Sequence, residues 1–228
     1  MHAEEKFAAV SQLICEQSRA KMLWSLLDGR AYTASELANS ADVSITSASN
    51  HLAKLLEADI IKVETQGRHR YFSFSRAEVA YAVESLAHLA DNSSGGIVKK
   101  INEPKGMKYC RTCYDHLAGL VGVKITEALE KKGFIAKDEM IYKVTRKGWN
   151  WFAGFGIERE AVQNNRRRVA RQCLDWSERR PHLAGQLGAI WLEKMFEKNW
   201  FRKVKFSREL IITSKGSIDI YHLLNVQI

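Results

Sequence analysis

The first ninety residues combine stretches of helical spacing with short stretches of alternating pattern. Over residues 6–27, apolar side chains recur three or four positions apart, which predicts two helices. Ser18 is the expected N-cap of the second helix, and Gly29 is expected to end it. Thr33 and Glu36 have the spacing of a capping box, which predicts the start of a third, short helix.

Residues 44–57 form the next predicted helix, and its two faces differ. One face holds Ile45, Ala48, Leu52 and Leu55 and is expected to be buried. The opposite face has short hydrogen-bonding side chains and one cation, which suit entry into a DNA major groove. With the short helix and turn before it, this helix predicts a helix-turn-helix. The residues expected to contact DNA from it are Ser44, Thr46, Ser47, Ser49, Asn50, His51 and Lys54.

An alternating pattern follows on both sides of Gly67 and predicts a β-hairpin. Its tip carries Arg68 and Arg70, placed to contact the DNA backbone or minor groove as a wing does. Residues 76–90 return to helical spacing. The predicted fold class is therefore mainly α with short β-hairpins, beginning with a winged helix-turn-helix.

This arrangement resembles the ArsR (arsenic-repressor-like) family of bacterial transcription factors over about residues 5–90. The resemblance implies a homodimer joined through its first and last helices, with two recognition helices in successive major grooves. It also implies repression relieved by an inducer. The matching residues are Ser18-Arg19 with LLDG, SELANSADVS, Ser44, Ser49, His51-Leu52, Leu55, Gly67-Arg68 and Tyr71.

Some family features are missing, and each motif has a simpler interpretation. The segment SELANSADV contains no cysteine, and only Glu84, His88 and Asp91 remain of the family's other common metal site, on the helix at 76–90. The known metal sites of the family therefore do not carry over. Ser44 and Ser49 also suit caps and helix-surface positions. His51 also suits a hydrogen bond within the domain, and the wing arginines also suit a solvated turn.

The second half contains an internal repeat. HLAGLVGVKITEALEKKGFI aligns without gaps with HLAGQLGAIWLEKMFEKNWF, and both are followed by a T-x-K-G motif. Each copy is expected to run helix, turn, helix and two strands, with T-x-K-G ending the hairpin. A helix at about 160–178 is expected before the second copy. The predicted domains are 1–90, a linker at 91–108, and 109–228 with winged-helix-like repeats at about 110–148 and 165–216.

Five of the six tryptophans lie in this second half, at Trp149, Trp151, Trp176, Trp191 and Trp200. Such a concentration of aromatic rings suits an organic-ligand pocket. It equally suits a filled seam between the two copies. Both interpretations remain open at the level of sequence.

The four cysteines are too few for a disulfide scaffold and are expected to be reduced. The spacing of Cys110, Cys113 and His116 suits a metal site that Cys173 and His182 could complete, with zinc or another soft metal as the ion. The two cysteines of C-x-x-C also suit a reversible dithiol switch. A third alternative is structural, because each histidine precedes an identical LAG and could start a helix.

Charge separates the two halves of the chain. The formal net charge is +9, yet residues 1–90 hold 9 Lys/Arg against 11 Asp/Glu, which leaves the basic excess in the second half. A basic chain favours an anionic partner, nucleic acid first. The sequence shows neither an export signal nor a long apolar stretch, so we expect a cytoplasmic protein without a membrane partner.

Transcriptional regulation is the function that these patterns favour. We expect a repressor that binds double-stranded DNA as a homodimer and that a small-molecule or redox inducer releases through the C-terminal half. An enzyme is not expected, because no Ser/His/Asp spacing, phosphate-binding glycine loop or HExxH occurs. The alternative is a thiol- or metal-based redox module tethered to a DNA-binding domain. A pure protein–protein scaffold would leave the polar helix face and the wing unexplained.

Overall fold

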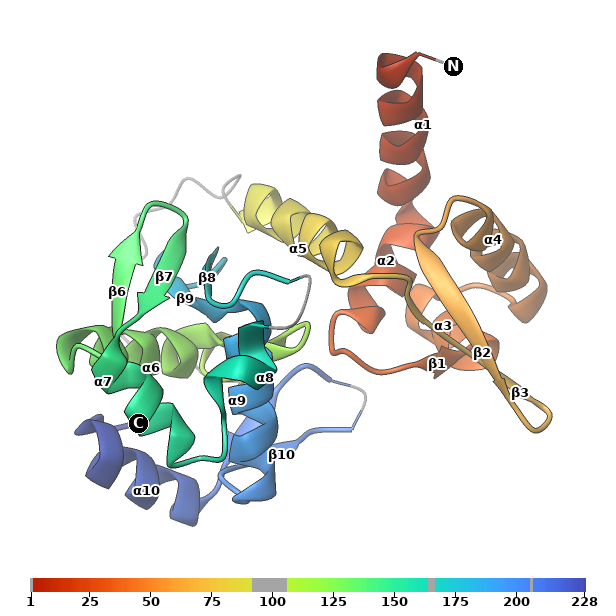
Figure 1. Cartoon of the computed structure of the whole chain (residues 1–228). Helices are drawn as coiled ribbons and strands as arrows, with labels where there is room; N and C mark the ends of the chain where they lie inside the picture. The colour runs from red at the N-terminus through yellow and green to blue at the C-terminus, as the bar shows by residue number, and fades with distance from the viewer. Residues whose placement is uncertain (1, 92–105, 164–166, 206) are drawn as a thin grey trace. The chain divides into compact units, whose positions relative to one another are not determined.

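The computed structural model describes residues 2–91, 106–163, 167–205 and 207–228. The chain divides into two compact units, unit 1 (Met1–Ala90) and unit 2 (Asp91–Ile228), each with its own core (Figure 1). Most of the predicted linker at 91–108 lies outside the described residues. None of the helices in the described part of the chain has the length and apolarity needed to cross a bilayer.

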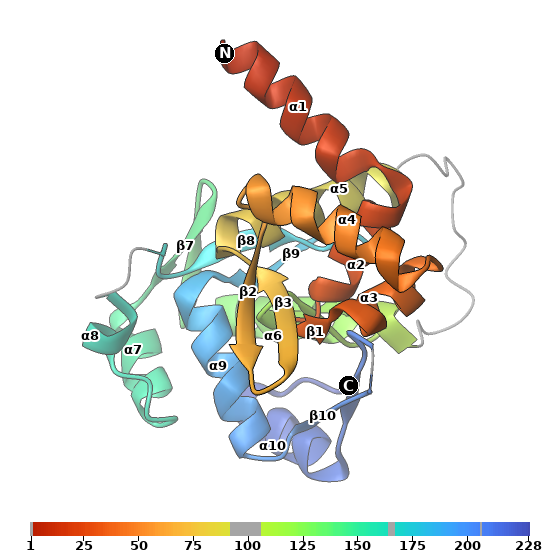
Figure 2. The ribbon, with the colours of Figure 1, turned by 90° about the vertical axis from the view of Figure 1, so that its right-hand side faces the viewer.

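Unit 1 is a winged helix-turn-helix. Its three strands form an antiparallel sheet in the order β1-β3-β2, and helices α2, α3 and α4 pack on one another beside it. Helix α1 extends away from the other elements of the unit in both views (Figure 1 and Figure 2). The elements are α1 (Ala3–Cys15), α2 (Gln17–Leu26), β1 (Tyr32–Thr33), α3 (Ala34–Ala41), α4 (Ile45–Glu57), β2 (Ile61–Gln66), β3 (His69–Phe74) and α5 (Ala77–Asp91).

The helix ends of unit 1 follow local capping chemistry, with two corrections to the sequence prediction. The Thr33–Glu36 capping box is formed at the start of α3. Helix α2 is capped by Glu16 rather than Ser18, because the Glu16 carboxylate reaches the free amides of the first turn. Ile45 is 57 % exposed and not buried. It is the first residue of α4, and the buried face of the helix begins one turn later, at Ala48.

Unit 2 mixes helix and sheet more evenly than the expected mainly α fold. Each half of it runs hairpin, helix, hairpin, helix. After η1 (Gly106–Lys108), the first half contains β4 (Arg111–Cys113), β5 (His116–Ala118), α6 (Gly119–Lys131), β6 (Ile135–Asp138), β7 (Ile141–Val144) and α7 (Arg146–Ala153). After α8 (Arg159–Gln163), the second half contains β8 (Arg171–Leu174), β9 (Pro181–Ala184), α9 (Gly185–Glu197), β10 (Phe201–Lys203), β11 (Leu210–Ile212) and α10 (Ser214–Leu224).

Three details of the predicted repeats are wrong. The helix-turn-helix expected in each copy is one continuous helix, α6 or α9, because apolar residues keep helical spacing along its whole length. The helix expected at 160–178 is the short α8 and then strand β8, where pairing with β7 and β9 overrides local helix propensity. T-x-K-G begins the helix after each hairpin rather than ending the hairpin.

The T-x-K-G motif has a specific packing role in both halves. Thr145 caps α7 and Thr213 caps α10, each accepting a hydrogen bond from the amide of the motif glycine. A Cβ on Gly148 would lie 2.0 Å from the Phe134 carbonyl oxygen, and one on Gly216 would lie 2.3 Å from that of Trp200. Only glycine therefore allows these helices to approach the preceding chain so closely.

The two halves of unit 2 interlock. Helix α6 of the first half packs on β9 of the second, and α9 of the second packs on β5 of the first. Strand β7 joins β8 to give a four-stranded sheet in the order β6-β7-β8-β9. The Thr126 hydroxyl on α6 also accepts a hydrogen bond from the Leu183 amide on β9. The core of unit 2 is therefore shared by both halves.

Aromatic rings fill the seam between these halves. Trp151 stacks on Phe134 at 4.8 Å between ring centroids and meets Trp191 of the other half edge-on at 5.6 Å. Trp200 is 1 % exposed. A cavity lined in part by Trp191 has a volume of only about 10 Å³, room for about one water molecule. The seam alternative therefore describes these aromatic residues better than the ligand pocket.

Candidate functional site

Helix α4 presents an exposed polar face. Its buried residues are Ala48, Leu52 and Leu55, which pack against α2, α3 and β2. On the other side, Thr46, Asn50 and Lys54 are exposed. No bulky side chain separates Thr46 from Asn50 and Lys54, so this face can approach the edges of bases and a phosphate backbone.

The remaining predicted residues of α4 are partly engaged within the unit. The Ser44 hydroxyl caps the helix by accepting from the Ser47 amide at 3.2 Å. The Ser49 hydroxyl donates to the Ile45 carbonyl at 2.9 Å, although the side chain is exposed. His51 is half-buried and its Nδ1 lies 3.3 Å from Arg19 Nη1.

Arg19 is a buried anchor whose position the sequence did not reveal. Its guanidinium donates to the carbonyls of Leu13 and Gln12 at the end of α1 and faces His51 on α4. Glu16, which caps α2, lies 3.5 Å from both Arg19 and His51. A hydrogen bond from the Arg19 amide, joined by one from the Ser18 amide, outweighs the opposing effect of burial and holds the pKa of Glu16 below its ordinary value. These contacts fix the angle at which α4 is presented.

The wing is the hairpin of β2 and β3, which pair from Ile61 with Phe74 to Gln66 with His69 (Figure 2). Gly67 has a φ of 59° at the first position of the two-residue turn, a conformation that favours glycine. Arg68 and Arg70 are both exposed at the tip. The predicted cations of the wing are therefore accessible to a phosphate backbone.

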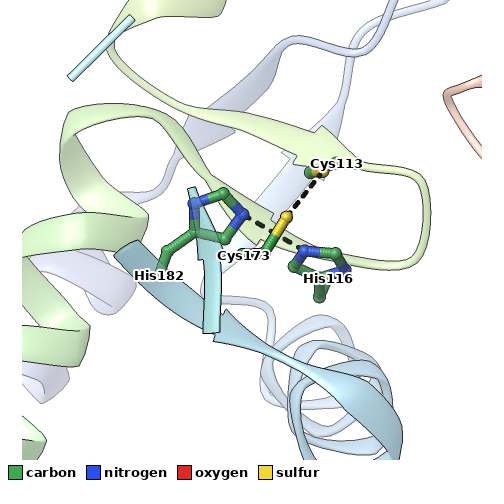
Figure 3. A group of neighbouring side chains, drawn as sticks. All are labelled: Cys113, His116, Cys173 and His182. Carbon is green, nitrogen blue, oxygen red and sulfur yellow. Dashed lines mark hydrogen bonds between the residues drawn. The ribbon is translucent and has the colours of Figure 1, made fainter. Parts of the chain in front are cut away.

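Unit 2 contains a buried group of two cysteines and two histidines, Cys113, His116, Cys173 and His182, which we call the Cys–His cluster. All four side chains are buried, and their ligand atoms lie within 4.8 Å of one another. His116 Nε2 lies 3.1 Å from His182 Nε2, and Cys113 Sγ lies 3.8 Å from Cys173 Sγ (Figure 3). The cluster is a candidate site for zinc or another soft metal.

Strand pairing explains how the cluster forms. Cys113 lies directly opposite His116 in the hairpin β4–β5, and Cys173 lies directly opposite His182 in β8–β9. Directly opposite residues of an antiparallel pair project to the same face of the sheet. Each hairpin therefore supplies one thiol and one imidazole, and packing of the two hairpins brings the pairs together.

Carboxylates support both imidazoles from behind. Asp115 Oδ1 lies 3.1 Å from His116 Nδ1, and Asp175 Oδ2 lies 3.3 Å from His182 Nδ1. Asp175 is itself held by Arg111 at 2.9 Å and by the Gly119 amide at 2.7 Å. These contacts turn the Nε2 atoms toward each other and toward the sulfurs.

Against the effect of burial, Asp115, Asp175 and Cys113 raise the pKa of the two histidines of the cluster. Burial lowers the pKa of His182, but Asp175 and Cys113 raise it by more, to about 8. Burial likewise opposes the charge of Asp175, yet His182 and Arg111 hold the pKa of this carboxyl far below its ordinary value. The pKa of His116 is raised against the effect of burial by Cys113 and Asp115. The surroundings thus stabilise positive charge at the imidazoles.

Cys110, expected to pair with Cys113, does not belong to the cluster. It precedes β4 and lies in the hydrophobic core, where burial raises the pKa of its thiol. C-x-x-C brings two sulfurs together only in a tight turn, whereas this segment enters an extended strand. The histidines also differ from the expected helix starts, because they lie in β5 and β9 ahead of α6 and α9.

Comparison with known proteins places the chain among transcription factors. A helix-turn-helix domain family matches residues 16–64. The uncharacterized HTH-type transcriptional regulator YdfF of Bacillus subtilis (strain 168) is 42% identical over 221 residues, which cover 97% of this chain and 98% of that protein. The likeness to YdfF therefore includes unit 2 as well as unit 1.

Solved structures match a smaller part of the chain. Reduced HlyU from Vibrio cholerae N16961 is 23% identical with a TM-score of 0.35, covering 38% of this chain and 90% of its own. The homodimeric winged helix-turn-helix domain of Mb0332 from Mycobacterium bovis, a possible ArsR-family regulator, is 20% identical with a TM-score of 0.36, covering 40% and 82%. From its full-length likeness to YdfF and its helix-turn-helix match, the chain belongs to the HTH-type transcriptional regulators, and its first ninety residues fold as a winged helix-turn-helix.

Proposed function

We propose that this regulator is a repressor that binds a specific duplex DNA sequence as a homodimer and leaves it when unit 2 receives a signal. The observation that carries the proposal is the exposed polar face of α4, with Thr46, Asn50 and Lys54 opposite a buried apolar face. Asn50 can pair with adenine through two hydrogen bonds in the major groove. Ser44, Ser47, Ser49 and His51 complete the predicted surface.

Arg68 and Arg70 on the wing supply the backbone contacts in this proposal. Residues 1–90 have 9 Lys/Arg against 11 Asp/Glu, so the general field of unit 1 does not attract DNA. Attraction then depends on local cations at the DNA-facing surface. We expect the affinity for DNA to fall as the salt concentration rises. The slope is set by the number of phosphates that these few cations neutralise.

Helix α1 supports the homodimer. It has no buried residue, and Phe7 is 75 % exposed while Val10 is 40 % exposed. An isolated helix of 13 residues is marginal in water, so this apolar face needs a partner. A second copy, pairing through α1 and α5, would provide one and would set two recognition helices a helical turn of DNA apart.

Unit 2 is the proposed sensing unit, built from two related repeats. A hollow of about 460 Å³ beside α6 and the chain end falls within the size range of small-molecule sites. Its charged lining residues are three lysines, Lys124, Lys131 and Lys132, and one carboxylate, Glu127, and this excess of cations favours an anionic molecule as the inducer. Such a molecule would act by binding the DNA-competent and DNA-incompetent dimers with different affinity.

Binding to DNA can be tested without knowing the operator. Selection from a random duplex library with the full chain is expected to enrich one sequence with approximate two-fold symmetry. Asn50→Ala is expected to weaken binding to that sequence by about fivefold to 150-fold, since a bidentate base contact contributes about 1–3 kcal/mol. Arg68→Ala should weaken specific and nonspecific binding alike and reduce the salt slope by about 1.

Lys62→Ala is the matched control for the wing, because Lys62 is an exposed cation at the other end of the same hairpin. This variant is expected to retain wild-type affinity. Enrichment of no sequence, or equal binding by the wild type, Asn50→Ala and Arg68→Ala, would overturn the proposal. A reporter gene placed behind the enriched sequence then tests repression, which should be lost in the Asn50→Ala variant.

A further inference from the structure

We propose that the Cys–His cluster is a structural zinc site, with Cys113, His116, Cys173 and His182 as its four ligands. The site lies in unit 2, whereas the residues proposed to contact DNA belong to unit 1, and the inference does not depend on the proposed repressor function. It also differs from the known metal sites of the ArsR family, because the resemblance to that family covers only residues 5–90.

The distances in the cluster match tetrahedral zinc. With Zn–S bonds of about 2.3 Å and Zn–N bonds of about 2.0 Å, tetrahedral geometry sets the sulfurs about 3.8 Å and the nitrogens about 3.3 Å apart. The two sulfurs lie 3.8 Å apart and the two Nε2 atoms 3.1 Å apart. The sulfur separation is much longer than the roughly 2 Å of a disulfide. The two sulfurs are therefore not joined by a disulfide, and both pairs have spacings close to those of tetrahedral zinc ligands.

The polar groups behind the ligands complete a metal site. Each histidine that binds a metal through Nε2 usually gives its Nδ1 proton to a carboxylate or carbonyl, which fixes the ring. Asp115 and Asp175 occupy this place for His116 and His182 (Figure 3 shows the four ligands). Asp115 is in turn held by Arg167 at 2.7 Å.

The chemistry and topology point to a structural role. Two thiolates and two imidazoles fill all four positions of a tetrahedral ion, and this closed set of sulfur and nitrogen ligands suits zinc. Zinc binding displaces the two thiol protons and involves no change of oxidation state. The cysteines are 60 positions apart in sequence and belong to opposite halves of unit 2. One ion would thus tie the two hairpins together.

Metal analysis of the full chain tests the site directly. We expect about one zinc per chain after purification under reducing conditions without chelator, and its loss in Cys113→Ser and in Cys173→Ser. Cys15→Ser is the matched control, because Cys15 is exposed and lies on α1 outside the cluster. This variant should keep the full zinc content.

Cobalt gives a measurement on the unaltered protein, in case the cysteine variants fail to fold. Replacing zinc by Co²⁺ should produce the intense visible bands of tetrahedral cobalt and a near-ultraviolet thiolate-to-cobalt band, and added zinc should abolish both. The inference is overturned if wild-type protein, reconstituted with zinc under reducing conditions, retains no metal and gives no such spectrum. Loss of zinc from Cys15→Ser alone, or a Cys113–Cys173 disulfide in the reduced preparation, would also overturn it.

Discussion

Gly148 and Gly216 show how a single atom constrains unit 2. In each T-x-K-G motif the threonine caps a helix, and the lysine donates to a carbonyl at the end of the preceding helix, as Lys147 does to Lys132 at 2.9 Å and Lys215 does to Lys198 at 3.1 Å. The glycine allows the main chain to pass against the carbonyl of Phe134 or Trp200. The motif is thus explained by packing alone.

Gly148→Ala should therefore be strongly destabilising. The added methyl would lie 2.0 Å from a backbone oxygen that cannot rotate away. We expect the free energy of unfolding to fall by about 3 kcal/mol, at the upper end of overpacking effects. Gly154→Ala, at the end of the same helix with an ordinary φ of −60°, should change it by less than about 1 kcal/mol. Denaturant unfolding checks this, and equal effects of the two variants would refute the argument.

Two ion pairs of unit 2 differ in burial and therefore in their expected contribution to stability. Arg111 and Asp175 are completely buried at 2.9 Å, whereas Arg180 and Glu127 pair at 2.6 Å with both side chains more than two-fifths exposed. Arg111→Met removes the guanidinium from the buried Asp175 carboxylate and should cost about 3–5 kcal/mol of stability. Arg180→Met should cost less than about 1 kcal/mol, since an exposed pair contributes little. Comparable losses in equilibrium unfolding would contradict the assigned roles.

At the scale of elements, the junction of α1, α2 and α4 determines how the recognition helix is presented. Glu16 caps α2, Arg19 joins the end of α1 to His51, and His51 belongs to α4. The family-like Ser18-Arg19 pair is therefore explained by the anchoring role of Arg19, not by a cap from Ser18. His51, predicted as a DNA contact, has these partners within unit 1 and is available to DNA only in competition with them.

The cap formed by Glu16 should give a recognisable pH dependence. Its folded-state pKa is lowered, so its contribution is present above the unfolded carboxyl pKa of about 4.3 and is lost as the pH falls through the lower folded value. Glu16→Ala should cost about 1 kcal/mol at pH 7, a typical value for an N-cap. The difference from wild type should shrink progressively below about pH 4, as Glu16 becomes protonated and loses the charge that binds the first-turn amides. A difference that stays constant from pH 7 to pH 3 would exclude this role.

At the scale of the whole molecule, the chain has two compact units with separate cores. The tryptophans divide unevenly between them, with Trp24 in unit 1 and the other five in unit 2. Tryptophan emission therefore reports mainly on unit 2. This asymmetry allows the stability of one unit to be followed within the intact chain.

Metal removal should therefore affect the two units differently. If zinc joins the hairpins β4–β5 and β8–β9, a chelator should lower the unfolding midpoint seen by tryptophan emission, because metal binding contributes to folding. The transition of unit 1, followed by hydrogen exchange of α2 to α4, should stay unchanged. Re-addition of zinc should restore the first midpoint. Identical shifts of both transitions would show that the chelator acts elsewhere.

The sequence by itself determined most of unit 1. Its capping box, the apolar face of α4 and the Gly67 hairpin are local patterns, in which the neighbours that satisfy a backbone group lie within a few positions. Such patterns predict structure because their physical causes are short-range. The sequence also showed that the two halves of unit 2 are related. It did not show which helices and strands each half forms.

Only the tertiary structure decided the contents of the Cys–His cluster and the exposure of Ile45. Cys110 and Cys113 are close in sequence but point into different surroundings, while Cys113 and Cys173 meet across 60 positions. The supporting carboxylates lie in the loops that join the two strands of each hairpin. The segment after α8 forms a strand because it pairs with β7 and β9. Contacts of this kind depend on how distant elements pack, and no local pattern records them.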